Sequence, residues 1–68
     1  MNEEHLNMQI RRFLKKVGIQ SQREIEAAVR QAVDAGSLAP GQTVQANVRL
    51  TVPGLDLAVD IPGEIEVE

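Results

Sequence analysis

The stretch Val44–Ile61, VQANVRLTVPGLDLAVDI, carries the clearest structural pattern in the chain. Apolar residues alternate with polar ones on both sides of Pro53-Gly54, as expected for two strands that each bury one face. Pro followed by Gly is a turn pair, because Pro fixes φ and Gly accepts a positive φ. The pattern predicts an antiparallel β-hairpin with strands at about 43–52 and 55–61.

The alternation also predicts a register. If two residues form the loop, Leu50 faces Leu57, every apolar side chain lies on one face, and a slip of one residue would scatter them. On the polar face Arg49 then has Asp56 and Asp60 as diagonal neighbours, within reach of a long side chain. We expect a solvated cluster of charges there.

A second turn is expected at Pro62-Gly63, followed by a third strand at 64–68. A two-residue loop would place Ile65 on the wrong face. A three-residue loop, or a bulge, restores the match by pairing Ile61 with Ile65. The alternative is a strand that bends at this point.

The first part of the chain predicts two helices, at about 3–17 and 21–35. Asn2 is a suitable N-cap for the first, and Gly18 is a suitable residue to end it. Ser21 and Glu24 have the spacing of a capping box, which would start the second helix. Their apolar residues recur at helical spacing: Leu6, Ile10, Phe13, Leu14 and Val17, then Ile25, Val29 and Val33.

The second helix is expected to end at Gly36, with Leu38 folding back onto it. These elements predict one small α+β domain, residues 1–68. Its order is ααββ(β), with two N-terminal helices packed on one face of a C-terminal antiparallel β-hairpin or three-stranded meander. A chain of 68 residues buries only about 60% of its unfolded surface, so complete burial matters.

Composition limits the classes of function. The chain has no cysteine, which excludes disulfides and thiolate chemistry and favours a reducing cytoplasm. No signal peptide and no membrane span is expected. The net charge is −3, and residues 38–68 carry five acidic side chains against one Arg. This acidity disfavours nucleic acid as a partner.

No catalytic, cofactor-binding or metal-ligating set is expected, and the protein is predicted not to be an enzyme. His5 is the only histidine, and it lacks an orienting partner and a nucleophile. Asp56 and Asp60 would lie about 13 Å apart along one strand, too far for paired carboxylate chemistry. The glycines form no phosphate-binding loop.

Protein binding or self-association is the favoured function, and DNA binding is the alternative. The segment 13–29 resembles a helix-turn-helix, in which Gln22 and Arg23 would contact bases in DNA. The other function is protein binding or homodimer formation. Strand 44–52 would lie at a sheet edge that neither Lys nor Pro blocks. A basic cluster of Arg11, Arg12, Lys15 and Lys16 would suit an acidic partner or the acidic strands of a second copy.

Several short segments resemble a family of short bacterial proteins of unknown function. The resemblance rests on Met1-Asn2-Glu3, Asn7-Met8, Arg12-Phe13-Leu14-Lys15, Val17-Gly18, Ser21-Gln22-Arg23-Glu24-Ile25-Glu26, Leu55-Asp56-Leu57 and Gly63-Glu64-Ile65. It implies a stand-alone bacterial cytoplasmic protein. It carries over no activity, ligand or site residue.

Overall fold

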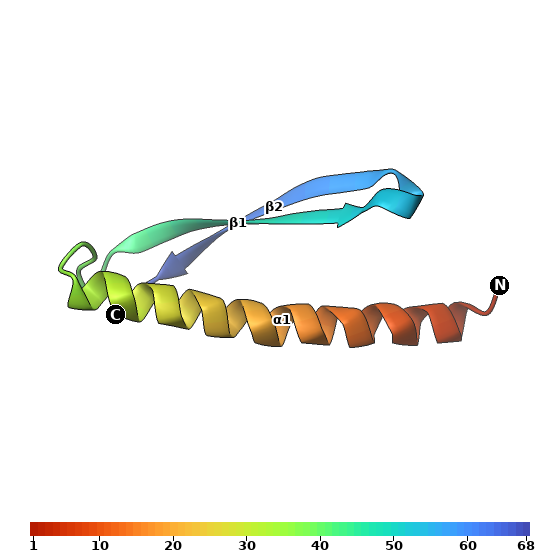
Figure 1. Cartoon of the computed structure of the whole chain (residues 1–68), viewed down its shortest axis with the longest axis horizontal. Coiled ribbons are helices and arrows are strands. Elements are labelled where there is room, and N and C mark those ends of the chain that lie inside the picture. Colours follow the sequence, from red (N-terminus) through yellow and green to blue (C-terminus); the bar gives the residue numbers. More distant parts are fainter.

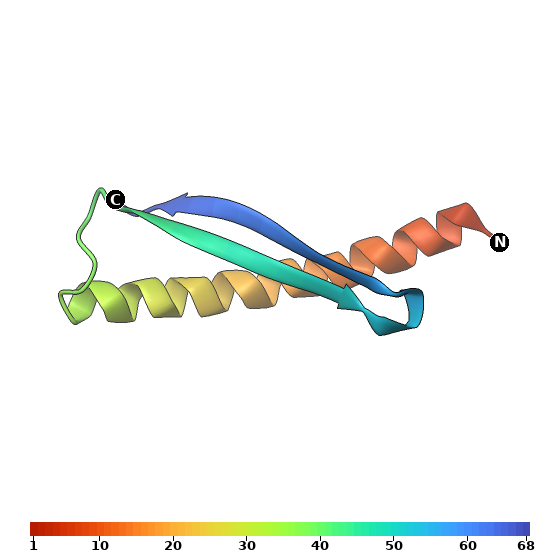
Figure 2. The same cartoon turned by 90° about the horizontal axis from the view of Figure 1, so that it is seen from above.

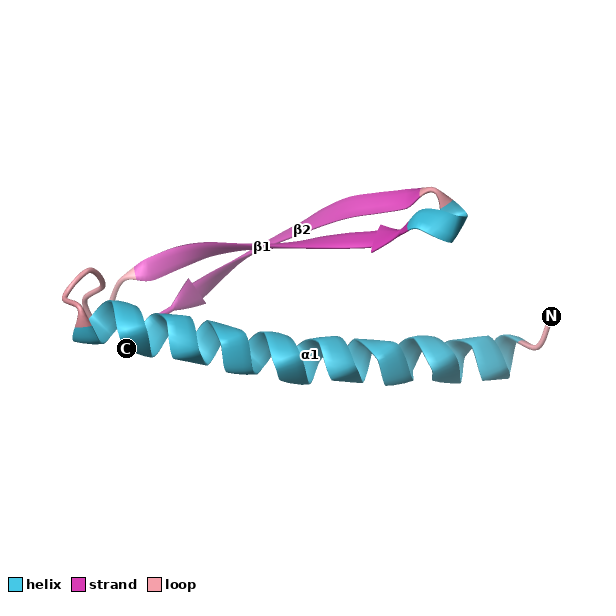
Figure 3. Cartoon of the chain, viewed as in Figure 1, coloured by secondary structure: helices cyan, strands magenta, loops and turns pink.

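The protein folds into one long helix and one β-hairpin that lie in two layers (Figures 1 and 3). The computed structural model describes residues 1–68. Helix α1 spans Glu3–Asp34, strand β1 Thr43–Val52, a 3₁₀ turn η1 Pro53–Leu55, and strand β2 Leu57–Glu66. The hairpin crosses α1 obliquely when seen from above (Figure 2). The α+β class is confirmed.

The prediction of two helices is wrong. Helix α1 continues for 32 residues through Gly18 and Ser21, where a break was expected. Gly18 has no positive φ, since the positive-φ glycines are Gly36 and Gly41. Ser21 lies inside the helix and caps no helix end. One glycine in a helix costs only about 1 kcal/mol relative to alanine, and no proline enforces a stop.

The apolar stripe gives the physical reason for continuity. Positions at intervals of three or four residues run through the expected break without losing phase. They are Ile10, Leu14, Val17, Ser21, Ile25, Ala28 and Ala32. Breaking the helix at Gly18 would turn one half of this stripe away from the hairpin. The unbroken spacing of the apolar residues across Gly18 therefore indicates helix continuity better than the local capping residues indicate a break.

Both outer ends of α1 are confirmed as predicted. The Asn2 side chain accepts a hydrogen bond from the His5 backbone N–H at 3.1 Å, as an N-cap does. At the other end Gly36 has φ +75°, and its N–H donates to the Val33 carbonyl at 3.0 Å. The Ser37 N–H donates to the Ala32 carbonyl at 3.0 Å, which completes a Schellman motif.

The hairpin forms, but its register differs from the expected one by two residues. Four residues, Pro53 to Asp56, make the loop, so Leu50 pairs with Val59 instead of Leu57. The reason is the fixed φ of proline. Two-residue hairpin loops need a positive φ at their first central residue, which Pro53 cannot adopt. A shift of two residues keeps every strand side chain on its face, so the apolar face is as predicted.

The predicted third strand and its three-residue turn are also wrong. Strand β2 runs through Pro62-Gly63 to Glu66, and Ile65 pairs with Val44 of β1. Proline fits here because it faces Asn47 at a position that needs no ladder hydrogen bond, as shown below. The sheet therefore has two strands, in the order β1–β2.

A pair of glycine substitutions tests the continuous helix. Gly18→Ala should raise the free energy of unfolding by about 0.5–1 kcal/mol, because alanine is the better helix former and nothing lies within 4 Å of the new Cβ. Gly36→Ala, at φ +75°, should lower it by about 1 kcal/mol. Urea denaturation followed by circular dichroism measures both. A loss of stability in Gly18→Ala would indicate a left-handed break at that residue.

Candidate functional site

An apolar cleft lies between the N-terminal half of α1 and the loop end of the hairpin. A hollow of about 360 Å³ opens there. Both walls are strongly exposed: Phe13 on α1 is 54% accessible to solvent and Ile61 on β2 is 53% accessible. We call this hollow the open cleft; its apolar side chains are Phe13, Leu14, Val17, Val48, Leu50 and Ile61.

The opposite end of the molecule is better packed but is not closed either. Val67, 8% accessible, is the only buried residue in the chain. Its N–H donates to the Gln42 carbonyl at 2.8 Å, and its carbonyl accepts from the Gly41 N–H. Beside it, Val44 and Ile65 face the C-terminal part of α1 across a second apolar hollow of about 250 Å³. The helix and the hairpin thus enclose no core.

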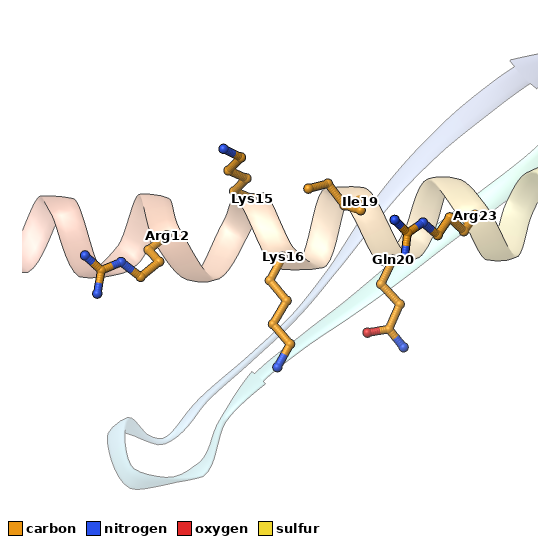
Figure 4. A pocket seen from close by; sticks show the side chains of 6 residues that line it. All are labelled: Arg12, Lys15, Lys16, Ile19, Gln20 and Arg23. Carbon is orange, nitrogen blue, oxygen red and sulfur yellow. The ribbon is translucent and has the colours of Figure 1, made fainter.

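The outer face of α1, turned away from the hairpin, carries a group of positive side chains. Arg12, Lys15, Lys16 and Arg23 project from successive turns and, with Ile19 and Gln20, line a shallow groove (Figure 4). Residues 5–23 include five Lys or Arg and no acidic side chain. None of the five makes an ion pair, since the two ion pairs are Arg30–Glu26 and Arg49–Asp60.

The structure brings together three of the four predicted partner-binding residues. It brings Arg12, Lys15 and Lys16 together as expected and adds Arg23 to them. Arg11 does not line the groove; it lies about 100° around the helix from Arg12. Binding of an acidic partner by these side chains stays a prediction.

The helix-turn-helix of segment 13–29 is not formed, because α1 has no turn there. Gln22, one of its two proposed base contacts, donates from Nε2 to Glu26 Oε1 at 2.9 Å. Arg23, the other, lies in the basic groove. The pattern of capping residues that suggested two helices also suggested the DNA-binding motif, so both predictions share one error.

The outer face of the hairpin is acidic, and hydrogen bonds join side chains of β1 to side chains of β2 across it. Arg49 pairs directly with Asp60, from Nη1 to Oδ1 at 3.5 Å, and not diagonally as predicted. The Asn47 amide donates to the same Asp60 oxygen at 3.4 Å, and the Gln45 amide donates to Glu64 at 3.2 Å. Asp56 lies in the loop at φ 57° and belongs to no cluster.

His5 lies in the first turn of α1, where only its backbone N–H is engaged, by Asn2. Groups of three or more His, Asp or Glu side chains suited to a metal ion do not occur. Helix α1, although long, lacks the apolar character that a membrane-spanning helix needs.

The fold and its surfaces define a small α+β protein with a single helix, a two-stranded sheet and an open apolar cleft. The chain belongs to the family of unknown function DUF6494, which it matches over residues 1–68. No curated protein and no solved structure matches it.

Substitution of Lys16 tests whether its ammonium group contacts an acidic group in the folded protein. Arg12 and Lys16 are four residues apart on α1, and like charges at this spacing destabilise a helix. Lys16→Glu should therefore raise the free energy of unfolding by about 0.5 kcal/mol at low salt, and Lys16→Gln by about half as much. Urea denaturation measures both. Destabilisation by Lys16→Glu would show that this ammonium group contacts an acidic group.

Proposed function

We propose that the protein is a self-associating module, a homodimer in which a second copy covers the open cleft. The observation that carries the proposal is the absence of an enclosed core: one residue of 68 is buried. A two-stranded hairpin is at best marginally stable in water by itself, and it needs a covered apolar face. The apolar side chains on both walls of the cleft are covered only when a partner fills the cleft.

The accessible area supports a large interface. The single chain exposes 6073 Å², whereas a compact protein of 7.5 kDa exposes roughly 4,200 Å². The excess is about 1,800 Å² per chain on that scaling, or about 3,600 Å² for two copies. This lies within the range of about 2,000–5,000 Å² that obligate homodimers bury.

The overall dimensions agree with the area. The radius of gyration is 15.9 Å, compared with about 11 Å for a compact chain of 68 residues. Its longest extent is 51 Å. These values describe an elongated subunit, which supports an extended interface with a partner of similar length.

A second copy is the partner favoured by stability. A chain that has almost no core alone needs its partner whenever it is folded. A second copy is present wherever the chain is made, and coupling of folding to dimer formation is usual in obligate homodimers. The charged faces lie outside the cleft, on the outer surfaces of α1 and of the hairpin. The side chains that a second copy covers at the cleft are therefore apolar, and we expect the dimer to resist salt.

Two isoleucines of equal exposure provide a matched test. Ile10 lies on the apolar stripe of α1 and is 47% accessible, while Ile19 lies on the outer face and is 45% accessible. Light scattering and sedimentation should show a wild-type dimer at low and high salt. Ile10→Gln should raise its dissociation constant about 10²–10⁴-fold, because two side chains lose about 1.5–3 kcal/mol of burial each. Ile19→Gln should leave it unchanged.

Circular dichroism on the same samples shows whether dissociation is accompanied by unfolding, which is the expected behaviour of a chain without a core. A wild-type monomer at every concentration, with cooperative unfolding independent of concentration, would contradict the proposal. Equal effects of the two glutamine substitutions would contradict it as well, because an isolated chain exposes both isoleucines equally.

A further inference from the structure

We infer that the two copies join through the outer edge of β1, forming a continuous four-stranded antiparallel sheet with both helices on its apolar face. This inference rests on the proposed dimer and specifies how it is built. Two kinds of observation carry it: the hydrogen-bonding register of the hairpin, and the different residues that its two edges present.

The register determines which backbone groups are free. The Val67 N–H donates to the Gln42 carbonyl, and antiparallel strands alternate between hydrogen-bonded and non-hydrogen-bonded pairs. Counting from this pair, Val44–Ile65 and Val48–Ile61 are hydrogen-bonded pairs, whereas Asn47–Pro62 is not. The N–H groups of the odd-numbered residues of β1 therefore point outward, away from β2. On β2 the backbone N–H groups of the even-numbered residues point outward, away from β1.

The outer edge of β2 is blocked. Its central outward position is Pro62, which has no N–H to donate. On either side of it lie Asp60 and Glu64, which a twofold axis at Pro62 would place opposite each other as like charges. Proline and inward-facing or flanking charges are the usual means of preventing strand addition at a sheet edge.

The outer edge of β1 is open. Its outward residues are Thr43, Gln45, Asn47, Arg49 and Thr51. None is a proline and one is charged. A twofold axis at Asn47, the middle of these five, pairs Asn47 with its own copy, Gln45 with Arg49, and Thr43 with Thr51. This register uses the whole strand and brings no like charges together, and its pairs are self-complementary as a twofold interface requires.

Four strands and two helices form layers of comparable width. Two strands occupy about 9.6 Å of sheet width, and packed helices lie about 8–10 Å apart. Four strands under two helices form a two-layer α/β sandwich, an arrangement that encloses a core.

Single-cysteine variants test the register directly, because the natural chain has no cysteine. Paired Asn47 residues would have Cα atoms about 5.5 Å apart, within disulfide range. Asn47→Cys should therefore oxidise rapidly to a covalent dimer. Thr51→Cys, on the same edge, should not, because its two copies would be about 26 Å apart along the strand. Cross-linking at equal rates in both variants would overturn the inference.

Proline substitutions give a second, non-covalent test. Asn47→Pro on β1 and Glu64→Pro on β2 each remove an outward N–H and one side-chain hydrogen bond, to Asp60 and to Gln45 respectively. Asn47→Pro should weaken the dimer at least about 100-fold by light scattering; Glu64→Pro should leave it intact. If wild-type protein is dimeric and Asn47→Pro stays dimeric, the β1 edge is excluded and the proposed function stands. If wild-type protein is monomeric, both proposals fall.

Discussion

The structure depends on one geometric constraint: a single helix and two strands cannot enclose a core. Each layer is about 10 Å wide, so side chains along the line of contact are covered from one direction and open to solvent on both flanks. Val29 and Ile65 show the consequence, since each faces the other layer and is still only half-buried. The helical stripe, the alternation in the strands and the charged outer faces are all consistent with a subunit that is completed by a second copy.

The elements of the fold that depend on short-range chemistry could be predicted from the sequence. The side-chain cap of Asn2, the end of α1 at Gly36 and the apolar face of the hairpin each follow from a few neighbouring residues. The errors arose where a local signal competed with long-range packing. Gly18 and Ser21 resemble a helix end and a helix start, yet the stripe from Ile10 to Ala32 gains burial only if the helix continues. Burial exceeds the cost of one glycine.

The two prolines show the same competition in the strands. Pro53 was correctly assigned to a turn, but its fixed φ excludes the two-residue loop and selects the four-residue one. The Pro62-Gly63 pair predicts a turn, although proline is also compatible with a strand whose outer edge is unpaired. The open cleft was not predicted, because two short helices would have covered the hairpin completely. The grouping of Arg12, Lys15 and Lys16 could be predicted, because side chains three and four residues apart share a face in a helix of any length.

The length of α1 is consistent with pairing at the β1 edge. Gln20 and Glu24 line a hollow with Asn47, so they lie on the side of α1 nearest the β1 strand. In the proposed dimer, a twofold axis near Asn47 would pass beside Gln20, and the two helices would run antiparallel past each other near their centres. Phe13, two turns before Gln20, would then be level with Ala27 of the second copy, two turns after it, so that a large side chain would meet a small one. The N-terminal turns, which extend beyond the chain's own hairpin, would lie beside the hollow between Ala32 and Val44 of the second copy. A helix broken at Gly18 could not reach it.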